Sequence, residues 1–414
     1  MKILVIGSGG REHAICWKLS LNDGVEKIYC ATGNGGTALT SKCENIGVSK
    51  IDDILNFAKE KNVDLTIVGS EELLVEGIVD KFKENGLKIF GADKKSALLE
   101  GSKAFAKEFM KKYGVRTAKY EIFDNHTKAK KYLKACEHPV VVKASGLAAG
   151  KGAIICNTLD ESLKAIHDIM VDKIFAQAGD KVVIEEYLQG VEASILSITD
   201  SNVIKDFISA KDHKKIGENE SGLNTGGMGA IAPNPYVSEE VYQDFYKNIL
   251  LPTLKGIKEE NMDFAGFIFF GLMITKKGVY LLEYNMRLGD PETQVVLPLL
   301  ESDFLEILNC AMEKNLKNCE IKWKNKSACC VVGVSKGYPL KYEKGFEIKG
   351  LENIENHYFI AGANLKDKLV TSGGRVISIV SVADSLDEAI KNSYEDIEKV
   401  DFENMYYRKD IGKI

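Results

Sequence analysis

The chain has 414 residues, of which 45% are hydrophobic and 28% are charged. It is too long for one hydrophobic core, so two or three domains are expected. This composition excludes an intrinsically disordered, collagen-like or coiled-coil protein. The formal net charge of −5 disfavours a nucleic-acid binder that depends on a broad basic surface, whereas small anionic ligands remain compatible with it.

The nine cysteines include no CxxC pair and no Cys/His cluster with zinc-finger spacing. Buried, reduced thiols in a cytoplasmic protein are therefore expected. The first residues, MKILVIGSGG, form an apolar run followed by glycines, which lacks the length and flanks of a signal peptide. No stretch reaches the roughly 18 apolar residues of a membrane span, so no membrane association is expected.

Residues 1–101 alternate between two kinds of pattern. Short β-branched runs at residues 3–6, 27–31, 65–68 and 88–90 predict strands. Helical periodicity at residues 51–61 and 73–85 predicts helices between them. This alternation is typical of a parallel sheet that is covered by helices on both faces.

The rhythm changes from about residue 117. Five strands are expected before residue 200, with only two helical stretches, which favours an antiparallel α+β unit. Two longer strands at residues 264–275 and 279–285 are expected to form a hairpin around residues 276–278. A last segment from about residue 325 is strand-rich and ends in an acidic helix at residues 386–398. The five expected strands lie at residues 120–123, 140–143, 153–156, 182–186 and 192–199.

A first glycine-rich stretch, GSGGREH at residues 7–13, follows a strand and opens a helix. The free N–H groups of such a turn form a natural anion site. A dinucleotide fingerprint would need glycine where Glu12 stands, so an NAD site is disfavoured. A turn without a ligand remains the alternative. Further glycines at positions 33, 35, 36 and 69 favour a small phosphorylated ligand at the carboxyl ends of the strands.

Two further glycine-rich stretches follow. Residues 143–152, KASGLAAGKG, are not a Walker loop, because Ser145 and Gly152 occupy the places of its glycine and hydroxyl residue and a strand follows. A mobile flap whose lysines approach phosphates is favoured over a flexible hairpin without a ligand. Residues 224–230, NTGGMGA, lie in a long segment without periodicity, which is typical of either a functional or a disordered loop.

Glu283, Asn285 and Arg287 alternate along one predicted strand and therefore share a face. A carboxylate and an amide beside a cation suit Mg²⁺ that holds nucleotide phosphates. The alternative is a plain Glu–Arg pair on an edge strand. Asp290 and Pro291 are expected to be the N-cap and the first residue of the next helix, whose donors would then point at an anion.

Six stretches follow one another along the chain: MKILVIGSGGREHA, VKASGLAAGKG, KDHK, NTGGMGA, EYNMRLGDPETQ and SGGR. Together they closely resemble the phosphoribosylamine–glycine ligase family of the ATP-grasp superfamily. The matching segments run from residue 1 to residue 412. The resemblance implies an α/β and α+β multidomain protein. Its parts would be a Rossmann-like pre-ATP-grasp domain (residues 1–101), an ATP-grasp domain (102–324) with a mobile lid (about 117–188), and a small β-rich C-terminal domain (325–414).

The activity that this resemblance implies is the ATP-dependent joining of glycine to 5-phosphoribosylamine, which gives glycinamide ribonucleotide, ADP and phosphate in de novo purine synthesis. The glycine carboxylate would attack the γ-phosphate, and the sugar amine would then open the glycyl phosphate. Such a transfer needs mainly positioning and charge neutralisation. The resemblance further implies ATP with Mg²⁺ or Mn²⁺ as the cofactors, and we expect a cytoplasmic monomer.

By position, the resemblance also assigns a role to individual residues. The catalytic group would be Arg287, Asp212 and Lys143, and the metal ligands would be Glu283 and Asn285. ATP would be bound by Lys103, Lys143, Gly146, Gly150, Lys151, Gly152, Glu185, Glu186, Tyr187, Leu188 and Glu192. The other substrates would be bound by Gly9, Gly10, Asn34, Gly69, Glu71, Asp212, Asn224, Gly226, Gly227, Met228, Arg287, Asp290 and Arg375.

The sequence departs from the family pattern in the flap, where Ser145 stands in place of the usual Asp. This change removes a carboxylate near the phosphates and puts the affinity and closure of the flap in question. Two other functions remain open at this point. The chain could be an ATP-grasp ligase for a different carboxylate or amine, or a non-catalytic nucleotide-sensing module.

Overall fold

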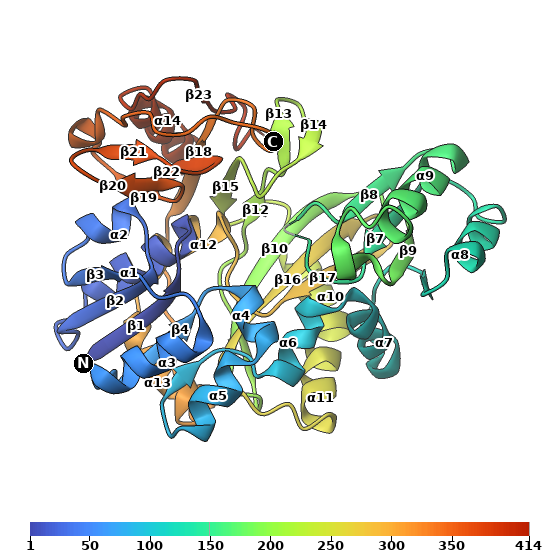
Figure 1. Cartoon of the computed structure of the whole chain (residues 1–414), viewed down its shortest axis with the longest axis horizontal. Coiled ribbons are helices and arrows are strands. Elements are labelled where there is room, and N and C mark those ends of the chain that lie inside the picture. Colours follow the sequence, from blue (N-terminus) through green and yellow to red (C-terminus); the bar gives the residue numbers. More distant parts are fainter. Residues whose placement is uncertain (149, 414) are drawn as a thin grey trace.

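A computed structural model describes residues 1–148 and 150–413. Ala149, within the expected flap, and Ile414, at the end of the expected C-terminal domain, lie outside the described residues. Figure 1 shows the N-terminal sheet in blue, the C-terminal strands in red next to it, and a lid in green that projects to the other side. Among the helices of the described residues, none combines the length and apolar character needed to cross a membrane.

The N-terminal sheet has five parallel strands in the order β3-β2-β1-β4-β5, which confirms the expected parallel sheet. Its strands are β1 (Lys2–Gly7), β2 (Lys27–Thr32), β3 (Cys43–Ile46), β4 (Leu65–Val68) and β5 (Ile89–Phe90). The helices of this unit are α1 (Gly10–Ser20), α2 (Gly35–Leu39), α3 (Ile51–Glu60), α4 (Glu71–Glu76), α5 (Ile78–Glu84) and α6 (Lys94–Gly101).

One prediction for this unit was wrong in detail, and one strand was missed. The single helix expected at residues 73–85 is split into α4 and α5, because Gly77 adopts a left-handed conformation with φ 98° that ends the first helix. The short strand β3 was not expected, since its sequence CENI lacks an apolar run.

The two faces of the N-terminal sheet pack against different parts of the chain. Ile3 and Val5 of β1 share a core with the C-terminal strands, whereas Leu4 and Ile6 share a core with the middle of the chain. Side chains alternate between the faces of a strand, so β1 contributes to both cores. This arrangement fixes the N-terminal unit between the other two.

Four of the five strands expected here form the antiparallel sheet of the lid, in the order β6-β9-β7-β8, whereas the fifth, at residues 192–199, lies in another sheet. The lid has a hydrophobic core of its own, formed by residues such as Leu133, Val142 and Ile166. A separate core allows this unit to move as one body. Its elements are β6 (Tyr120–Phe123), α8 (His126–Leu133), β7 (Val140–Ala144), β8 (Ala153–Cys156), α9 (Leu159–Met170), the short 3-10 helix η1 (Ala176–Gly179) and β9 (Val182–Glu186).

The body of the middle region is a four-stranded antiparallel sheet in the order β11-β10-β16-β17, in which β16 and β17 form the expected hairpin. The strands are β10 (Val191–Thr199), β11 (Ile204–Asp206), β16 (Gly266–Thr275) and β17 (Gly278–Asn285). The helices are α7 (Lys103–Tyr113), α10 (Glu239–Phe245), the π-helix η2 (Tyr246–Leu250), α11 (Leu251–Glu259), α12 (Glu292–Leu299), α13 (Phe304–Met312) and the 3-10 helix η3 (Leu316–Asn318).

The last sheet joins segments from two regions of the sequence. Its order is β12-β15-β18-β22-β19, and β23 also pairs with β18. The strands β12 (Lys211–Asp212) and β15 (Gly229–Ala232) come from the middle of the chain, and β15 pairs with β18 along four residues. The others are β18 (Ser327–Ser335), β19 (His357–Ile360), β22 (Arg375–Ala383) and β23 (Met405–Tyr406).

The remaining elements surround this sheet. The long segment around residues 211–232 is ordered, because β13 (Lys215–Gly217) and β14 (Ser221–Asn224) form a hairpin between β12 and β15. The other elements are the hairpin of β20 (Ala363–Leu365) and β21 (Leu369–Thr371), the 3-10 helix η4 (Leu351–Asn353) and α14 (Leu386–Ile397), which matches the acidic helix expected there.

Candidate active site

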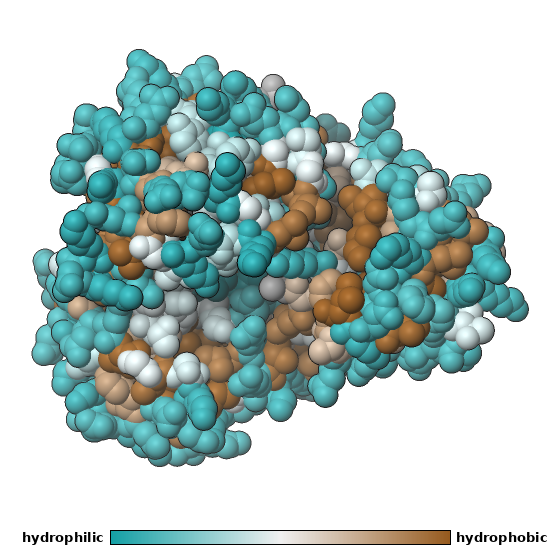
Figure 2. All heavy atoms as spheres, turned by 45° about the horizontal axis from the view of Figure 1, so that its top comes forward, coloured by the Kyte–Doolittle hydropathy of each residue, from teal (hydrophilic) through white to brown (hydrophobic). Residues whose placement is uncertain are grey.

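A cavity of about 980 Å³ is lined by residues of all the units described above. Figure 2 shows a hollow near the middle of the molecule with apolar side chains along its rim. The cavity brings together most of the residues predicted from the sequence. Those on its wall are Glu71, Lys103, Lys143, Gly150, Lys151, Gly152, Glu185, Glu186, Tyr187, Leu188, Glu192, Asp212, Asn224, Gly226, Glu283, Asn285, Arg287, Asp290 and Arg375.

Other predicted residues are not on this wall. Asn34 is 4% exposed, its Oδ1 accepts from the N–H of Gly36 at 2.8 Å, and its amide donates to the carbonyl of Ile360 at 2.8 Å. A Cβ at Gly69 would lie 2.1 Å from Oε1 of Glu12, so this glycine permits close packing. Both positions therefore have a structural role in holding the loops together. The predicted residues away from the wall are Gly9, Gly10, Asn34, Gly69, Gly146, Gly227 and Met228.

Two buried lysines share one carboxylate at the lid side of the cavity. Glu185, at the end of β9, lies 3.0 Å from Nζ of Lys143 and 3.2 Å from Nζ of Lys107. Lys107 also donates to Oγ1 of Thr117 at 2.6 Å. Burial lowers the pKa of Lys107 to about 8 in spite of the neighbouring carboxylate. A ligand phosphate would thus meet positive charge that is already held in place by Glu185.

Carboxylates and lysines alternate along the floor of the cavity. Lys214 pairs with Glu192 at 2.8 Å. Burial opposes the charge of Lys214, but Glu192, Glu283 and Asp212 outweigh it and raise the pKa of Lys214 above its ordinary value. Burial likewise opposes the charge of Glu283, but Lys214, Lys103 and Lys143 keep the pKa of Glu283 below its ordinary value. Both groups are therefore charged near neutral pH.

Glu283 and Asn285 fit a divalent metal ion. The ionised carboxylate of Glu283 is an acceptor-only group, and Oδ1 of Asn285 accepts a hydrogen bond from Nη2 of Arg287 at 3.3 Å. The alternative of a plain Glu–Arg pair does not describe this strand, although β17 is indeed an edge strand. Arg287 instead lies 2.9 Å from Glu100 and 3.3 Å from Glu71.

Asp212 lies on the wall of the cavity. Its Oδ1 atom is buried and has no hydrogen-bond partner among the residues that the structure describes. Burial, with a contribution from Glu292, raises the pKa of Asp212 well above its ordinary value, and Lys214 only partly offsets this. A Cβ at Gly227 would lie 2.7 Å from that oxygen, so glycine lets the loop pass close to Asp212. An unpartnered carboxyl oxygen of this kind can accept a proton or an N–H group.

Arginines and carboxylates alternate on the side of the cavity next to the N-terminal unit. Arg11 is 9% exposed, donates to the carbonyl of Leu288 at 3.1 Å and lies 3.8 Å from Glu71. Burial opposes the charge of Glu71, but Arg287 and Arg11 lower the pKa of Glu71 below its ordinary value. Burial raises the pKa of Glu100 although Arg287 is adjacent. The row positions two guanidinium groups at one wall.

The expected helix cap at Asp290 was wrong. Helix α12 begins at Glu292 and Pro291 occupies the cap position, so Asp290 lies outside the helix. The carboxylate of Asp290 instead accepts from the amide of Gln294 at 2.7 Å and lies 3.3 Å from Nη2 of Arg375. Asp290 thus pairs with Arg375 of the C-terminal unit and does not cap α12. Rules for helix caps consider only neighbouring residues, so they could not include this long-range ion pair.

The C-terminal unit closes one end of the cavity. Arg375 donates to the carbonyls of Gly226 at 2.6 Å and Asp290 at 2.7 Å. The hydroxyl of Tyr338 accepts from the N–H of Gly226 at 2.9 Å. Nζ of Lys151, in the flap, donates to the carbonyl of Pro339 at 3.3 Å. These contacts connect the 224–230 loop and the flap to the same C-terminal segment.

Ser145 is not on the wall of the cavity. It is 5% exposed, its carbonyl accepts from the N–H of Lys103 at 2.7 Å, and its hydroxyl accepts from the N–H of Ala104 at 3.1 Å. The side chain therefore satisfies a free donor in the first turn of α7. Through these bonds it also sets the distance between α7, which carries Lys103, and β7, which carries Lys143.

Several residues of the wall were missed from the sequence: Arg11, Glu100, Lys107, Lys214 and Tyr338. Helical periodicity could have indicated that Lys107 is buried, because it lies three residues after Ala104 and three before Met110, both on the buried face of α7. Lys214 belongs to the KDHK stretch, where only Asp212 was assigned. The other residues depend on contacts between distant segments.

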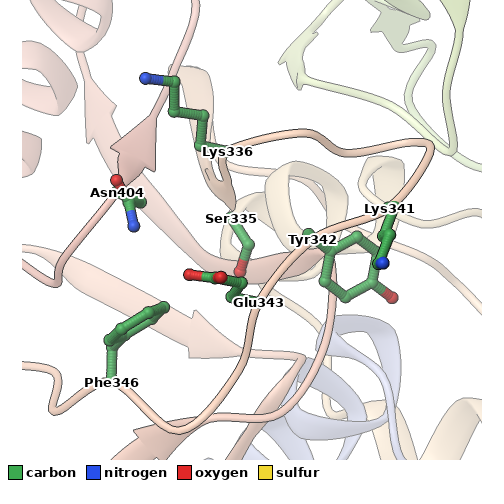
Figure 3. Close-up of a pocket in the computed structure, with 7 residues that line it drawn as sticks. All are labelled: Ser335, Lys336, Lys341, Tyr342, Glu343, Phe346 and Asn404. Carbon is green, nitrogen blue, oxygen red and sulfur yellow. The ribbon is translucent and has the colours of Figure 1, made fainter.

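A second, smaller cavity of about 300 Å³ lies in the C-terminal unit. Figure 3 shows that its lining side chains come from the segment around residues 335–346 and from Asn404. The lining residues are Ser335, Lys336, Lys341, Tyr342, Glu343, Phe346 and Asn404. None of the residues assigned from the sequence lines it.

Comparison with solved structures identifies the class of fold. The biotin carboxylase domain of a 2-oxoglutarate carboxylase from Hydrogenobacter thermophilus superposes with a TM-score of 0.74 over 98% of this chain and 91% of that chain, at 17% identity. A likeness at this identity concerns the fold alone. A family model of an ATP-grasp domain matches residues 101–293, so the lid and the cavity lined by lysines and carboxylates belong to an ATP-grasp protein.

Closer relatives identify the family. Family models of phosphoribosylglycinamide synthetase match in three parts: the N domain at residues 1–100, the ATP-grasp (A) domain at 101–293 and the C domain at 328–414. A phosphoribosylamine–glycine ligase from Fusobacterium nucleatum is 60% identical over 100% of this chain and 99% of its own. A solved phosphoribosylamine–glycine ligase from Thermotoga maritima is 33% identical, with a TM-score of 0.89 and both chains fully covered. The chain belongs to the phosphoribosylglycinamide synthetase family.

Proposed function

We propose that this chain joins glycine to 5-phosphoribosylamine at the expense of ATP and so makes glycinamide ribonucleotide, ADP and phosphate for purine synthesis. The observation that carries the proposal is the single cavity in which Lys103, Lys143, Glu283, Arg287 and Asp212 meet. The relatives that match this chain over its full length bear the name of this activity.

ATP would lie between the lid and the body sheet. Lys103 and Lys143 would contact its phosphates, and the flap at residues 145–152 would close over them. Glu185, whose carboxylate is paired with Lys143 and Lys107, would lie beside the base at the lid side of the cavity. Glu186 to Leu188 would border the base, and Glu192, now paired with Lys214, would accept from the ribose hydroxyls.

Glu283 and Asn285 would hold Mg²⁺ or Mn²⁺. A bound divalent ion screens the negative charge of the phosphates that the nucleophile approaches. Lys103, Lys143 and Arg287 add positive charge to the same region, so little acid–base chemistry is needed in the first transfer. The glycine carboxylate attacks the γ-phosphate there, the bond to the β-phosphate oxygen breaks, and ADP leaves.

In the second transfer, the sugar amine attacks the carbonyl carbon of glycyl phosphate and expels phosphate. The attacking nitrogen must lose a proton, and the carboxylate of Asp212 is a suitable acceptor, since its raised pKa makes it a stronger base than an ordinary carboxylate. Arg287 would orient the acyl group. Arg375 and the loop from Asn224 to Gly229 would enclose it, and the sugar phosphate would lie toward Arg11 and Glu71.

We further propose three functional units that meet at about residues 101 and 324, with a lid at about residues 117–188. The chain would act as a monomer in the cytoplasm. Strands β12 and β15 would belong to the ATP-grasp unit by function, although they complete the sheet of the C-terminal unit.

The test measures ADP release with 5-phosphoribosylamine formed in situ from ribose 5-phosphate and ammonia. ATP, glycine and the sugar amine are each omitted in turn. We expect ADP to form only when all three are present, and glycinamide ribonucleotide to accumulate in equal amount. Equal ADP release without glycine would indicate an ATP-grasp ligase for another carboxylate, and ATP binding without turnover would indicate a nucleotide-sensing module. Either result would refute the proposal.

A further inference from the structure

Three cysteine side chains from separate elements converge in the N-terminal unit, away from the cavity. Cys16 lies on α1, Cys30 on β2 and Cys43 on β3. The sulfurs of Cys16 and Cys30 are 3.5 Å apart, and all three sulfurs lie within 4.8 Å of one another. Among the described residues, no other set of three histidine, cysteine or acidic side chains meets this geometry.

The arrangement follows from the sheet register. Cys43 pairs with Ile28 of the neighbouring parallel strand, and Cys30 lies two residues further along that strand, so both sulfurs leave the same face of the sheet. Helix α1 packs on that face and brings Cys16 above them. Cys16 and Cys30 are 0% and 1% exposed, whereas Cys43 is only half-buried and provides a route from solvent.

These distances suit one metal ion. Three sulfurs that each lie about 2.3 Å from a common cation are about 4 Å apart, which is close to the 3.5 Å between Cys16 and Cys30 and within the 4.8 Å that bounds all three separations. Soft thiolate ligands select soft or borderline cations such as Cu⁺ and Zn²⁺ over Mg²⁺. The neighbouring Lys27 places a positive charge beside Cys43, which offsets part of the negative charge of three thiolates.

We propose that Cys16, Cys30 and Cys43 form a binding site for one thiophilic d¹⁰ cation, Zn²⁺ or Cu⁺. Each coordinated thiol releases its proton to solvent, and no electron is transferred. The ion would tie α1 to β2 and β3. Since α1 begins at the Gly9–Gly10 turn and β2 leads to Asn34, the site would stabilise the loops behind the sugar-phosphate side of the cavity.

The test uses the full-length protein, purified reduced and without air. Separate samples receive Zn²⁺, Cu⁺ as its acetonitrile complex, or Mg²⁺, and the metal that remains after gel filtration is counted by elemental mass spectrometry. The variants are Cys43→Ser, which changes the most accessible ligand, and Cys136→Ser, a half-buried cysteine of the lid as the matched control. Proton release in weak buffer provides a second readout.

We expect about one equivalent of Zn²⁺ or Cu⁺ in the wild type and in Cys136→Ser, with proton release, and no retained Mg²⁺. Whichever of the two ions is retained identifies the cation. Cys43→Ser should bind at least about tenfold more weakly while its unfolding temperature without metal stays near that of the wild type. The proposal is overturned if the wild type retains no thiophilic ion, or if it retains no more than Cys43→Ser. A Cys16–Cys30 disulfide, two mass units lighter, in place of bound metal would also overturn it.

Discussion

Glu185→Gln removes the carboxylate that Lys107 and Lys143 share. Glu185 and Lys107 are each about 2% exposed, and Lys143 is 9% exposed, so water can do little to replace the lost charge. Breaking a buried ion pair by removing one partner costs about 3–5 kcal/mol, because the other charge stays buried without compensation. Since two ammonium groups lose their partner here, we expect the free energy of unfolding to fall by this amount at pH 7.

The loss should depend on pH in a defined direction. The pKa of Lys107 is about 8 in the folded wild type and 10.5 in its ordinary state, so the unfolded chain binds more protons between these values. Stability from this group therefore rises with pH across that window. In Glu185→Gln the attraction to the carboxylate is gone and the pKa of Lys107 falls further. Lys107 then becomes neutral at lower pH, so the deficit should shrink between pH 7 and pH 9.

The assay is urea unfolding of the full chain at pH 7 and pH 9, followed by fluorescence. Glu186→Gln is the matched control, because Glu186 is the exposed neighbour on the same strand. The double variant Lys107→Met with Glu185→Gln should recover part of the loss, since it removes one of the two uncompensated charges. A Glu185→Gln variant as stable as Glu186→Gln, or a deficit that stays constant from pH 7 to pH 9, would refute the reasoning.

Three further substitutions test the cavity. Glu283→Ala should lower the rate of ADP release by on the order of 100-fold or more at ordinary Mg²⁺ while the variant still folds, and near-normal rates would remove Glu283 from the metal site. Arg287→Lys should lower kcat/KM roughly 10–100-fold, because the planar guanidinium that meets Glu71 and Glu100 is lost. The control Arg116→Lys changes only a half-exposed ion pair with Asp244 and should lower kcat/KM little. Equal effects would contradict this. Tyr338→Phe should raise the KM for glycine roughly fivefold, because the hydrogen bond from the N–H of Gly226 is lost. Tyr342→Phe should leave the KM unchanged. A normal KM in both variants would show that this hydrogen bond is dispensable.

Much of the fold could be predicted from the sequence because its signals are local. The strands at residues 120–123 and 153–156 were predicted at their observed bounds, since each is an apolar, β-branched or aromatic run between turns. The helix break at Gly77 was missed because the apolar periodicity continues through it. The strand β3 was missed because its stability comes from pairing with β2 and hardly from its own residue types.

The site divides in the same way. Glu283, Asn285 and Arg287 could be placed on one strand from alternation alone, and all three line the cavity. The row from Arg11 to Glu71 to Arg287 to Glu100 could not be predicted, since its members come from four distant segments that only the complete fold brings together. Asp290 was placed in a helix cap for the same reason: its partner Arg375 lies 85 residues away.

The sheet that joins β15 to β18 has a consequence for synthesis of the chain. On the ribosome, the N-terminal unit and the lid can begin to fold as soon as they emerge. Strand β15, however, ends at Ala232, and its partner β18 is made only from Ser327 onward. Until then the edge of β15 that pairs with β18 has no partner, although its four residues are buried in the complete fold. Such an unpaired edge is a template for association with other chains. A fragment that stops before Ser327 should therefore aggregate, because β15 would lack its partner strand β18.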